Sequence, residues 1–568
     1  MKVLTVYRAR AELLRRLAII AGLLIAYSAM TAALYHGLRP EHAAPAINIM
    51  RSSAPPTRNV SVASDRFFVD GEPFFIKAVG WDPTRPGELP WTRRLDLDEV
   101  GEDFRRIRAA GFNVIRTWAP MRPEELALAL QHGLRVLQGV WVAPDGDFAD
   151  PSFRRQALAD VARAVESSRH SEAVLGYLVL NEPRAEAVAR AGLDGTQAFL
   201  REVVATVRAL DPAAPIGYAS WPGLEALDDD LLDFVAFNLY PHRPRVVMTE
   251  LGLAAYTKMV RETIARGRPL IISEFGLSVS PGLPLATPGR GGSSPEEQAQ
   301  ELVALAETFT SAGAAGLAVF QWSDGWWKNN DGPGDALSQD PMDPEEWFGL
   351  VQFVDADDRR GTPRPALAAL QSHQRAVLLE PRSGAAAPEE IAVRLHAEEE
   401  IGIDVRIDGG AAIAVPLQRT CSTCYEGLLR LPPMDGRFEL AFDVLDASGV
   451  VIRSERRLLR RGGAPTTDLE LSPGRITVTP GEAFTVALRT TAAGEPVASS
   501  VTIAAYSEDE FYEHRYQLNT GAGGRIEASF VAPMRTTLMT IVAFGDDPAL
   551  PPSERSARWT VVEVREGT

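Results

Sequence analysis

Two apolar segments that lie about 90 residues apart constrain the fold of this chain more than any other feature. Residues 177–183 read YLVLNEP, and residues 270–276 read LIISEFG. Each is a run of mostly aliphatic residues that ends in a glutamate and is then broken by proline or glycine. This pattern is typical of a buried parallel strand that carries a carboxylate at its C-terminal end. We therefore expect Glu182 and Glu274 to lie at the same edge of one sheet.

Strand-like and helix-like stretches alternate around these two segments, as in a series of βα units. Residues 66–77 are typical of a hairpin, because an Asp70-Gly71 turn separates two apolar runs, and the second arm leads into the first strand. We count eight strands and eight helices over about 310 residues, with Glu182 ending the fourth strand and Glu274 the seventh. The series predicts a (β/α)8 TIM barrel over residues 62–380, a fold whose chemistry lies at the C-terminal ends of its strands.

The chain changes character after the barrel. Past residue 384, short alternating runs are separated by Asp-Gly, Ser-Gly and Pro-Gly pairs without a helical period, which is typical of all-β sandwiches. We expect one sandwich over residues 388–462 and a second, immunoglobulin-like sandwich over residues 466–568. Residues 462–467 (GGAPTT) would link them, although one larger sandwich fits the same pattern.

The N-terminus has the pattern of a membrane anchor. Residues 1–16 carry five Lys or Arg side chains, and residues 17–38 carry no Lys, Arg, Asp or Glu. This predicts a cytoplasmic basic segment (1–16), a single transmembrane helix (17–38) and a stalk (39–61), with the rest of the chain periplasmic or extracellular. A cleaved signal peptide is the alternative, and it would export the same part of the chain.

Charge and cysteine content exclude several classes of function. A net charge of −17 argues against nucleic acid as a partner, because phosphate binding needs a basic surface. Cys421 and Cys424 are the only two cysteines, too few for a structural zinc site, and in an exported chain they favour a local disulfide. We expect neither a metal ion nor a cofactor.

Several motifs of residues 66–380 resemble the catalytic barrels of retaining clan A glycoside hydrolases, of the family 2 and family 5 type. They are FIKAVG (75–80), GFNVIR (111–116), NEP (181–183), SEFG (273–276), QWSD (321–324), and WFGLV (347–351) followed by TPRPA (362–366). The resemblance implies that Glu182 is the acid/base and Glu274 the nucleophile, and that Asn181 binds the sugar 2-hydroxyl. Two features depart from the family: AVGWD (78–82) replaces its usual Gly-Val-Asn phrase, and the β modules follow the barrel.

The residue types agree with that chemistry. A retaining mechanism needs two carboxyl groups about 5–5.5 Å apart, one protonated and one ionised. We expect Arg116, at the end of the second strand, to pair with Glu274 and keep it ionised. Tyr240 would donate a hydrogen bond to the same carboxylate. Trp322 and Trp118 would offer flat apolar faces to a sugar ring.

These observations predict a membrane-anchored retaining glycosidase or transglycosylase that acts on β-linked, exported or cell-surface carbohydrate. Its partners would be an oligo- or polysaccharide substrate, the membrane through the N-terminal helix, and an envelope protein through the C-terminal sandwiches. The alternative is a catalytically silent carbohydrate-binding scaffold of the cell envelope.

Overall fold

The computed structural model describes residues 59–566, apart from 228–229, 283–288, 329–334, 463–466, 508–512 and 546–553. The predicted basic segment, the anchor and most of the stalk therefore lie outside the described residues. Within the described residues, no helix is both long enough and apolar enough to span a bilayer.

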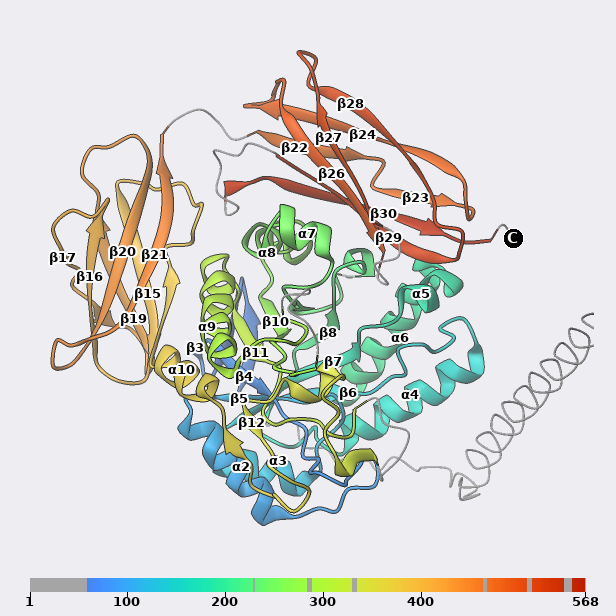
Figure 1. Cartoon of the computed structure of the whole chain (residues 1–568), viewed down its shortest axis with the longest axis vertical. Coiled ribbons are helices and arrows are strands. Elements are labelled where there is room, and N and C mark those ends of the chain that lie inside the picture. Colours follow the sequence, from blue (N-terminus) through green and yellow to red (C-terminus); the bar gives the residue numbers. More distant parts are fainter. Residues whose placement is uncertain are drawn as a thin grey trace, which may run out of the picture. The chain divides into compact units, whose positions relative to one another are not determined.

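Eight parallel strands form a closed barrel in the middle of the chain, as the alternating pattern predicted (Figure 1). In order around the barrel they are β4 (Ile76–Gly80), β5 (Val114–Arg116), β6 (Arg135–Val140), β7 (Val174–Asn181), β8 (Ile216–Ser220), β9 (Val235–Asn238), β10 (Leu270–Phe275) and β11 (Gly316–Val319). Almost every residue of these strands is buried, because helices cover the outside and side chains fill the inside.

The helices that connect the strands are α2 (Leu97–Ala109), α3 (Pro123–Gln131), α4 (Pro151–Glu166), α5 (Ala185–Ala191), α6 (Leu193–Leu210), α7 (Arg245–Glu250), α8 (Leu253–Val260), α9 (Pro295–Ser311) and α10 (Pro365–Gln374). Local signals set their ends: Ser294 caps α9 in a capping box with Glu297, and Pro295 takes the first helical position. Between β7 and β8, α5 and α6 are separated at Gly192, whose φ of 75° a helix does not allow.

A small antiparallel sheet closes the N-terminal end of the barrel. It consists of β1 (Val60–Ala63), β2 (Arg66–Val69) and β3 (Glu72–Phe74). Asp70 and Gly71 both have positive φ, as the tight turn between β2 and β3 requires. Phe67 points into the barrel, where its ring lies 5.2 Å from that of Phe234, and it belongs to a cluster that lines the barrel interior.

The first β module is a sandwich of two four-stranded sheets, one with the order β14-β15-β19-β18 and the other β17-β16-β20-β21. Its strands are β14 (Ala376–Glu380), β15 (Glu390–Ala397), β16 (Ile401–Ile407), β17 (Ile413–Ala414), β18 (Gln418–Arg419), β19 (Cys424–Arg430), β20 (Gly436–Asp446) and β21 (Val451–Arg461). Residues 376–380, assigned to the barrel above, pair with β15 and so belong to this sandwich. A disulfide joins Cys421 to Cys424 in the turn before β19.

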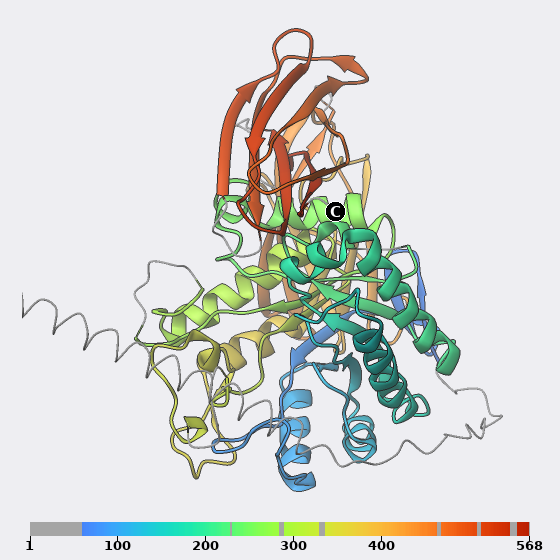
Figure 2. The ribbon, with the colours of Figure 1, turned by 90° about the vertical axis from the view of Figure 1, so that its right-hand side faces the viewer.

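The second β module is also built from two sheets. Its strands are β22 (Asp468–Ser472), β23 (Arg475–Val478), β24 (Ala483–Ala492), β25 (Glu495–Pro496), β26 (Ser500–Ser507), β27 (Glu513–Asn519), β28 (Arg525–Val531), β29 (Thr537–Gly545) and β30 (Ala557–Val564). Figure 2 shows these strands, in red, above the green helices of the barrel. Each β module has its own apolar core, so the expected order of a barrel followed by β domains is confirmed.

A buried carboxylate connects the second sandwich to the loop that follows β8. Glu225 is almost fully buried, and it accepts hydrogen bonds from Tyr256 of α8 (2.5 Å), Tyr506 of β26 (2.6 Å) and Thr540 of β29 (2.6 Å). Removal of either β26 or β29 would leave a buried charge with fewer donors, which is costly. The sandwich therefore helps to fix a loop at the C-terminal end of the barrel.

Candidate active site

Glu182 lies directly after β7, the fourth strand of the barrel. Leu180 and Glu182 have φ values of 72° and 45°, which are unfavourable for residues with a side chain and typically occur at functional sites. The pairing of β7 with β8 shifts between Leu178 and Asn181, so the strand end turns away from a regular ladder. This local geometry directs the Asn181 and Glu182 side chains toward the same groups at the C-terminal end of the barrel.

Glu274 lies within β10, the seventh strand, and three side chains contact its carboxylate. Arg116 Nη2 lies 2.7 Å from Oε1, and Trp118 Nε1 donates to the same oxygen at 2.8 Å. Tyr240 donates its hydroxyl to Oε2, also at 2.8 Å. These donors come from the ends of β5 and β9, so two strands orient the carboxylate that a third strand, β10, carries.

The sequence did not indicate two residues that support this arrangement. Asn238, at the end of β9, donates from Nδ2 to Glu182 Oε1 at 2.7 Å, and its own Oδ1 accepts from Ser273 Oγ at 2.7 Å. Ser273 is the neighbour of Glu274, so this chain of hydrogen bonds joins the two strand ends. Arg116 also donates to Asn181 Oδ1 at 2.5 Å, which adds a second connection.

The environments of the two carboxyl groups differ. Burial raises the pKa of Glu182 to about 7, and the negative charge of Glu274 acts in the same direction. Burial also raises the pKa of Glu274, whereas the charge of Arg116 and the hydrogen bond from Tyr240 act to lower it. Burial and the charge of Glu274 raise the pKa of Tyr240 well above 10, so it stays a donor. Glu182 is thus protonated for much of the population near neutral pH.

The expected stacking role of Trp322 is wrong. Its side chain is 0% exposed and packs in the core outside the strands, with the Arg106 guanidinium of α2 5.4 Å from the ring. Because β11 ends at Val319, the chain has left the strand before residue 322. Phe320 lies at the site instead, with ring centroids 5.4 Å from Trp118 and 6.1 Å from Tyr240.

Trp118 is at the site, but in a different role from the one expected. It is half-buried, it holds Glu274 through its indole N–H, and the Arg116 guanidinium lies 4.1 Å from its ring. One face of the ring is therefore covered by a cation. Gly80 on β4 makes this position accessible, because a Cβ there would come within 2.6 Å of the Trp118 ring. The departure at AVGWD thus has a local reason: glycine leaves room for the indole.

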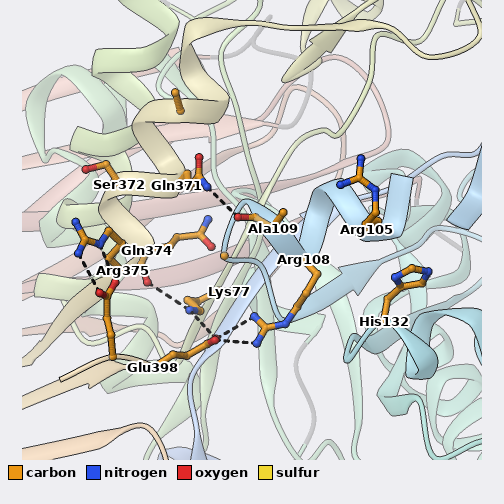
Figure 3. Close-up of a pocket in the computed structure, with 13 residues that line it drawn as sticks. Lys77, Arg105, Arg108, Ala109, His132, Gln371, Ser372, Gln374, Arg375 and Glu398 are labelled. Carbon is orange, nitrogen blue, oxygen red and sulfur yellow. Dashed lines mark hydrogen bonds and ion pairs between the residues drawn. The ribbon is translucent and has the colours of Figure 1, made fainter. Parts of the chain in front are cut away.

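A cavity of about 850 Å³ lies far from these residues, at the N-terminal end of the barrel (Figure 3). Lys77 is the second residue of β4, and in the figure its side chain and that of Arg108 point toward Glu398 of the first sandwich. Arg108 and Glu398 form two hydrogen bonds, of 2.8 and 2.9 Å, and Arg375 pairs in the same way with Glu399. Two carboxylates of the first sandwich thus pair with basic side chains of the barrel across this cavity.

Within the described part of the chain, no three His, Cys, Asp or Glu side chains are grouped closely enough to hold a metal ion. At the C-terminal end of the barrel, the described residues bring together two carboxyl groups in different environments. An eight-stranded parallel barrel with this pair at the ends of its fourth and seventh strands is the arrangement expected from the resemblance to the glycosidase class.

Comparison with known proteins gives relatives of that class. Over 235 residues, 40% of this chain and 34% of the relative, it is 26% identical to a β-glucuronidase of Pongo abelii. It is 27% identical over 239 residues to the β-glucuronidase of Rattus norvegicus, with the same coverage. The chain thus spans about a third of the length of the curated relatives that it matches. No family model matches.

Among solved structures, a β-glucuronidase from Ruminococcus gnavus in complex with D-glucuronic acid aligns with a TM-score of 0.45 and 16% identity, over 56% of this chain and 52% of that one. Together with the closed parallel barrel, the sequence likeness confirms the resemblance to clan A glycoside hydrolase barrels.

Proposed function

We propose that this chain hydrolyses β-glycosidic bonds by double displacement, with Glu274 as the nucleophile and Glu182 as the acid/base. The unequal environment of the two carboxyl groups is the observation that supports this proposal most directly. Glu274 accepts three hydrogen bonds or ion pairs from Arg116, Trp118 and Tyr240, whereas Glu182 accepts one from the neutral amide of Asn238. Such a separation of environments is how one site keeps one carboxyl ionised and the other protonated.

In the first step, the Glu182 carboxyl gives its proton to the glycosidic oxygen as the bond from that oxygen to the anomeric carbon breaks. A carboxylate oxygen of Glu274 bonds to the anomeric carbon, which gives a glycosyl ester. In the second step, Glu182 takes a proton from water, and the water oxygen displaces Glu274. Arg116 and Tyr240 restore the hydrogen bonds of the released carboxylate. If a sugar hydroxyl replaces water, the same steps give transglycosylation.

The names of the relatives indicate which sugar should be tested first as the substrate. Because the proteins of Pongo abelii and Rattus norvegicus are β-glucuronidases, a β-linked glycuronide is the first substrate to test. We further propose that the enzyme acts outside the cytoplasm on exported or cell-surface carbohydrate. The basic residues 1–16 followed by the uncharged residues 17–38 support this location.

Mechanism-based labelling tests the proposed chemistry. The ectodomain from residue 52 onward would be incubated with 2-deoxy-2-fluoro β-glycosides of glucuronic acid, galacturonic acid, glucose, galactose, mannose and xylose, each with a good leaving group. We expect one sugar to form a covalent adduct, located by peptide mass spectrometry on Glu274 and absent from Glu274→Gln. The Glu182→Gln variant should still form the adduct, because the leaving group needs no proton. An adduct on another residue would contradict the assignment.

The alternative, that the protein is a catalytically silent carbohydrate-binding scaffold, predicts a different result of the same labelling experiment. It predicts no adduct with any of these sugars and equal polysaccharide binding by the wild type and the Glu182/Glu274 double variant. For the location, protease added to spheroplasts, whose outer envelope has been opened, should cleave the barrel of the full chain. Protection until the spheroplasts are lysed would contradict a position outside the cytoplasm.

A further inference from the structure

Four neighbouring strands of the barrel are each followed by a loop that carries a tryptophan. In the order β11, β4, β5 and β6 around the barrel, these residues are Trp327, Trp91, Trp118 and Trp141. Each comes after the C-terminal end of its strand, which is the end where Glu182 and Glu274 lie. We call this set the tryptophan wall.

The outer members of the tryptophan wall expose large apolar surfaces. Trp91 is 71% exposed and Trp141 is 51% exposed, while Trp327 is half-buried. Trp91 and Trp327 contact each other edge to face, with ring centroids 6.4 Å apart. A single exposed tryptophan needs no explanation, but several on one side of a catalytic face mark a surface that binds a ligand.

The strand register places Trp141 at the end of β6, the strand that lies beside the one carrying the acid/base. Side chains alternate along β6, and Leu137 faces the barrel interior, so Gly139 and Trp141 continue on that face. Gly139 lies against Trp118, where a Cβ would come within 2.6 Å of its backbone. Because Val140 pairs with Val179 of β7, Trp141 lies next to Leu180, two residues before Glu182.

The other end of the wall is connected to the nucleophile by direct contacts. Trp327 precedes Lys328, whose ammonium group lies 4.0 Å from the centroid of the Phe320 ring. Phe320 packs edge to face against Trp118, which donates to Glu274. The wall therefore runs from the Glu182 side of the site to the loops beyond the nucleophile.

We propose that the tryptophan wall binds successive sugar residues of a β-linked polysaccharide, so that the substrate is a polymer and not a small glycoside. A pyranose ring presents a flat face of C–H groups, and an indole is the largest flat apolar surface available to pack against it. Trp141 would bind a sugar on the acid/base side of the cleaved bond, and Trp91 with Trp327 would bind sugars further along the chain. This inference rests on the proposed function and extends it from the reacting sugar to its neighbours.

The test compares substrates of different length that carry the same sugar. The sugar that labels Glu274 would be prepared as a β-linked disaccharide and as a tetraoside, both without a chromogenic group. The kcat/KM would be measured from the reducing ends released by the wild type, Trp91→Ala and Trp141→Ala. We expect the tetraoside to be preferred by the wild type at least about tenfold, and each variant to reduce this preference by about tenfold. The control, Leu428→Ala, removes a side chain of the first sandwich that is 63% exposed and should leave both values unchanged.

Binding measurements separate failure of this inference from failure of the proposed function. Tetrasaccharides of the six sugars used for labelling would be titrated into Glu274→Gln while tryptophan fluorescence is recorded. Saturable binding of one of them that Trp141→Ala weakens supports the wall, whether or not the wild type is labelled. Labelling of Glu274 without any preference for the tetraoside, or a preference that survives both tryptophan substitutions, would overturn it.

Discussion

At the C-terminal end of the barrel, Glu182 and Glu274 lie within one hydrogen-bonded group that includes Arg116, whereas at the N-terminal end each carboxylate has its own arginine. The C-terminal end also contains the positive φ values of Leu180 and Glu182. The N-terminal end is closed by apolar side chains and by ion pairs to the first sandwich. The difference indicates that the C-terminal end holds two carboxyl groups in an arrangement that they would not keep in water. The N-terminal end supplies stability that offsets the cost of that arrangement.

Among the substitutions that test this comparison of the two barrel ends, the largest expected effect is on catalysis. Glu182→Gln keeps the shape of the side chain but cannot donate a proton to the leaving group. We expect kcat/KM to fall by about 10²–10⁴-fold for glycosides with poor leaving groups and by much less for those with good leaving groups, as measured with a series of aryl glycosides. An equal loss across the whole series would show that Glu182 is not the acid. Glu186→Gln, on α5 four residues further along, is the matched control and should keep full activity.

A core substitution at the opposite end should act on stability alone. Phe67 is fully buried in the cluster inside the barrel, so Phe67→Ala should lower the free energy of unfolding by about 3–5 kcal/mol in urea denaturation. Phe68 lies on the other face of the same strand and is half-buried, so Phe68→Ala should cost clearly less. At a temperature where Phe67→Ala remains folded, its kcat/KM should equal that of the wild type. A large fall in kcat/KM there would contradict the division between the two ends.

Much of this division could be predicted from the sequence, because strand ends are visible in it. Glu182, Glu274, Arg116 and Tyr240 each follow an apolar run, and the parallel barrel then brings them together. The hydrogen bonds from Ser273 to Asn238 and from Asn238 to Glu182 were not predictable, because they depend on register shifts at the strand ends that the apolar pattern does not show. Trp322 was misplaced because the end of a buried strand has no marker when large apolar residues, here Phe320 and Trp322, continue beyond it. The sequence pattern of residues 376–380 fits the barrel and the first sandwich equally well.

The raised pKa of Glu182 predicts that the catalytic end lowers stability at neutral pH. The pKa is about 7 in the folded chain against an ordinary value of 4.5, so between these two values the folded state binds more protons than the unfolded state. The contribution of the Glu182 carboxyl to the free energy of unfolding is therefore fully present below about pH 4.5, and it is lost as the pH rises through 7. Glu182→Gln should raise the free energy of unfolding at pH 8 by about 1–3 kcal/mol and hardly change it at pH 4. A gain that is the same at both pH values would mean that the carboxyl is not held protonated.

The smallest effect concerns the ion pairs at the N-terminal end. Lys77 is almost fully buried, and its ammonium group lies 3.5 Å from Glu398, which also pairs with Arg108. Burial lowers the pKa of Lys77 and Glu398 acts against this shift, so Glu398→Gln leaves a buried cation without its counter-charge. Because Glu398 itself is partly exposed, we expect a loss of about 1 kcal/mol at neutral pH. The loss should shrink as the pH is raised far enough to deprotonate Lys77.

Glu399→Gln is the control for this prediction, since Glu399 pairs with Arg375 in the same bidentate geometry but both side chains are exposed. Its cost should stay below about 0.5 kcal/mol, because water screens the pair. Both variants should keep the kcat/KM of the wild type. Equal losses of unfolding free energy for the two variants would mean that the burial of Lys77 adds nothing to the strength of its ion pair with Glu398. The N-terminal end would then owe its stability to apolar packing around Phe67, and the contrast between the two ends would be one of hydrophobic burial and not of charge pairing.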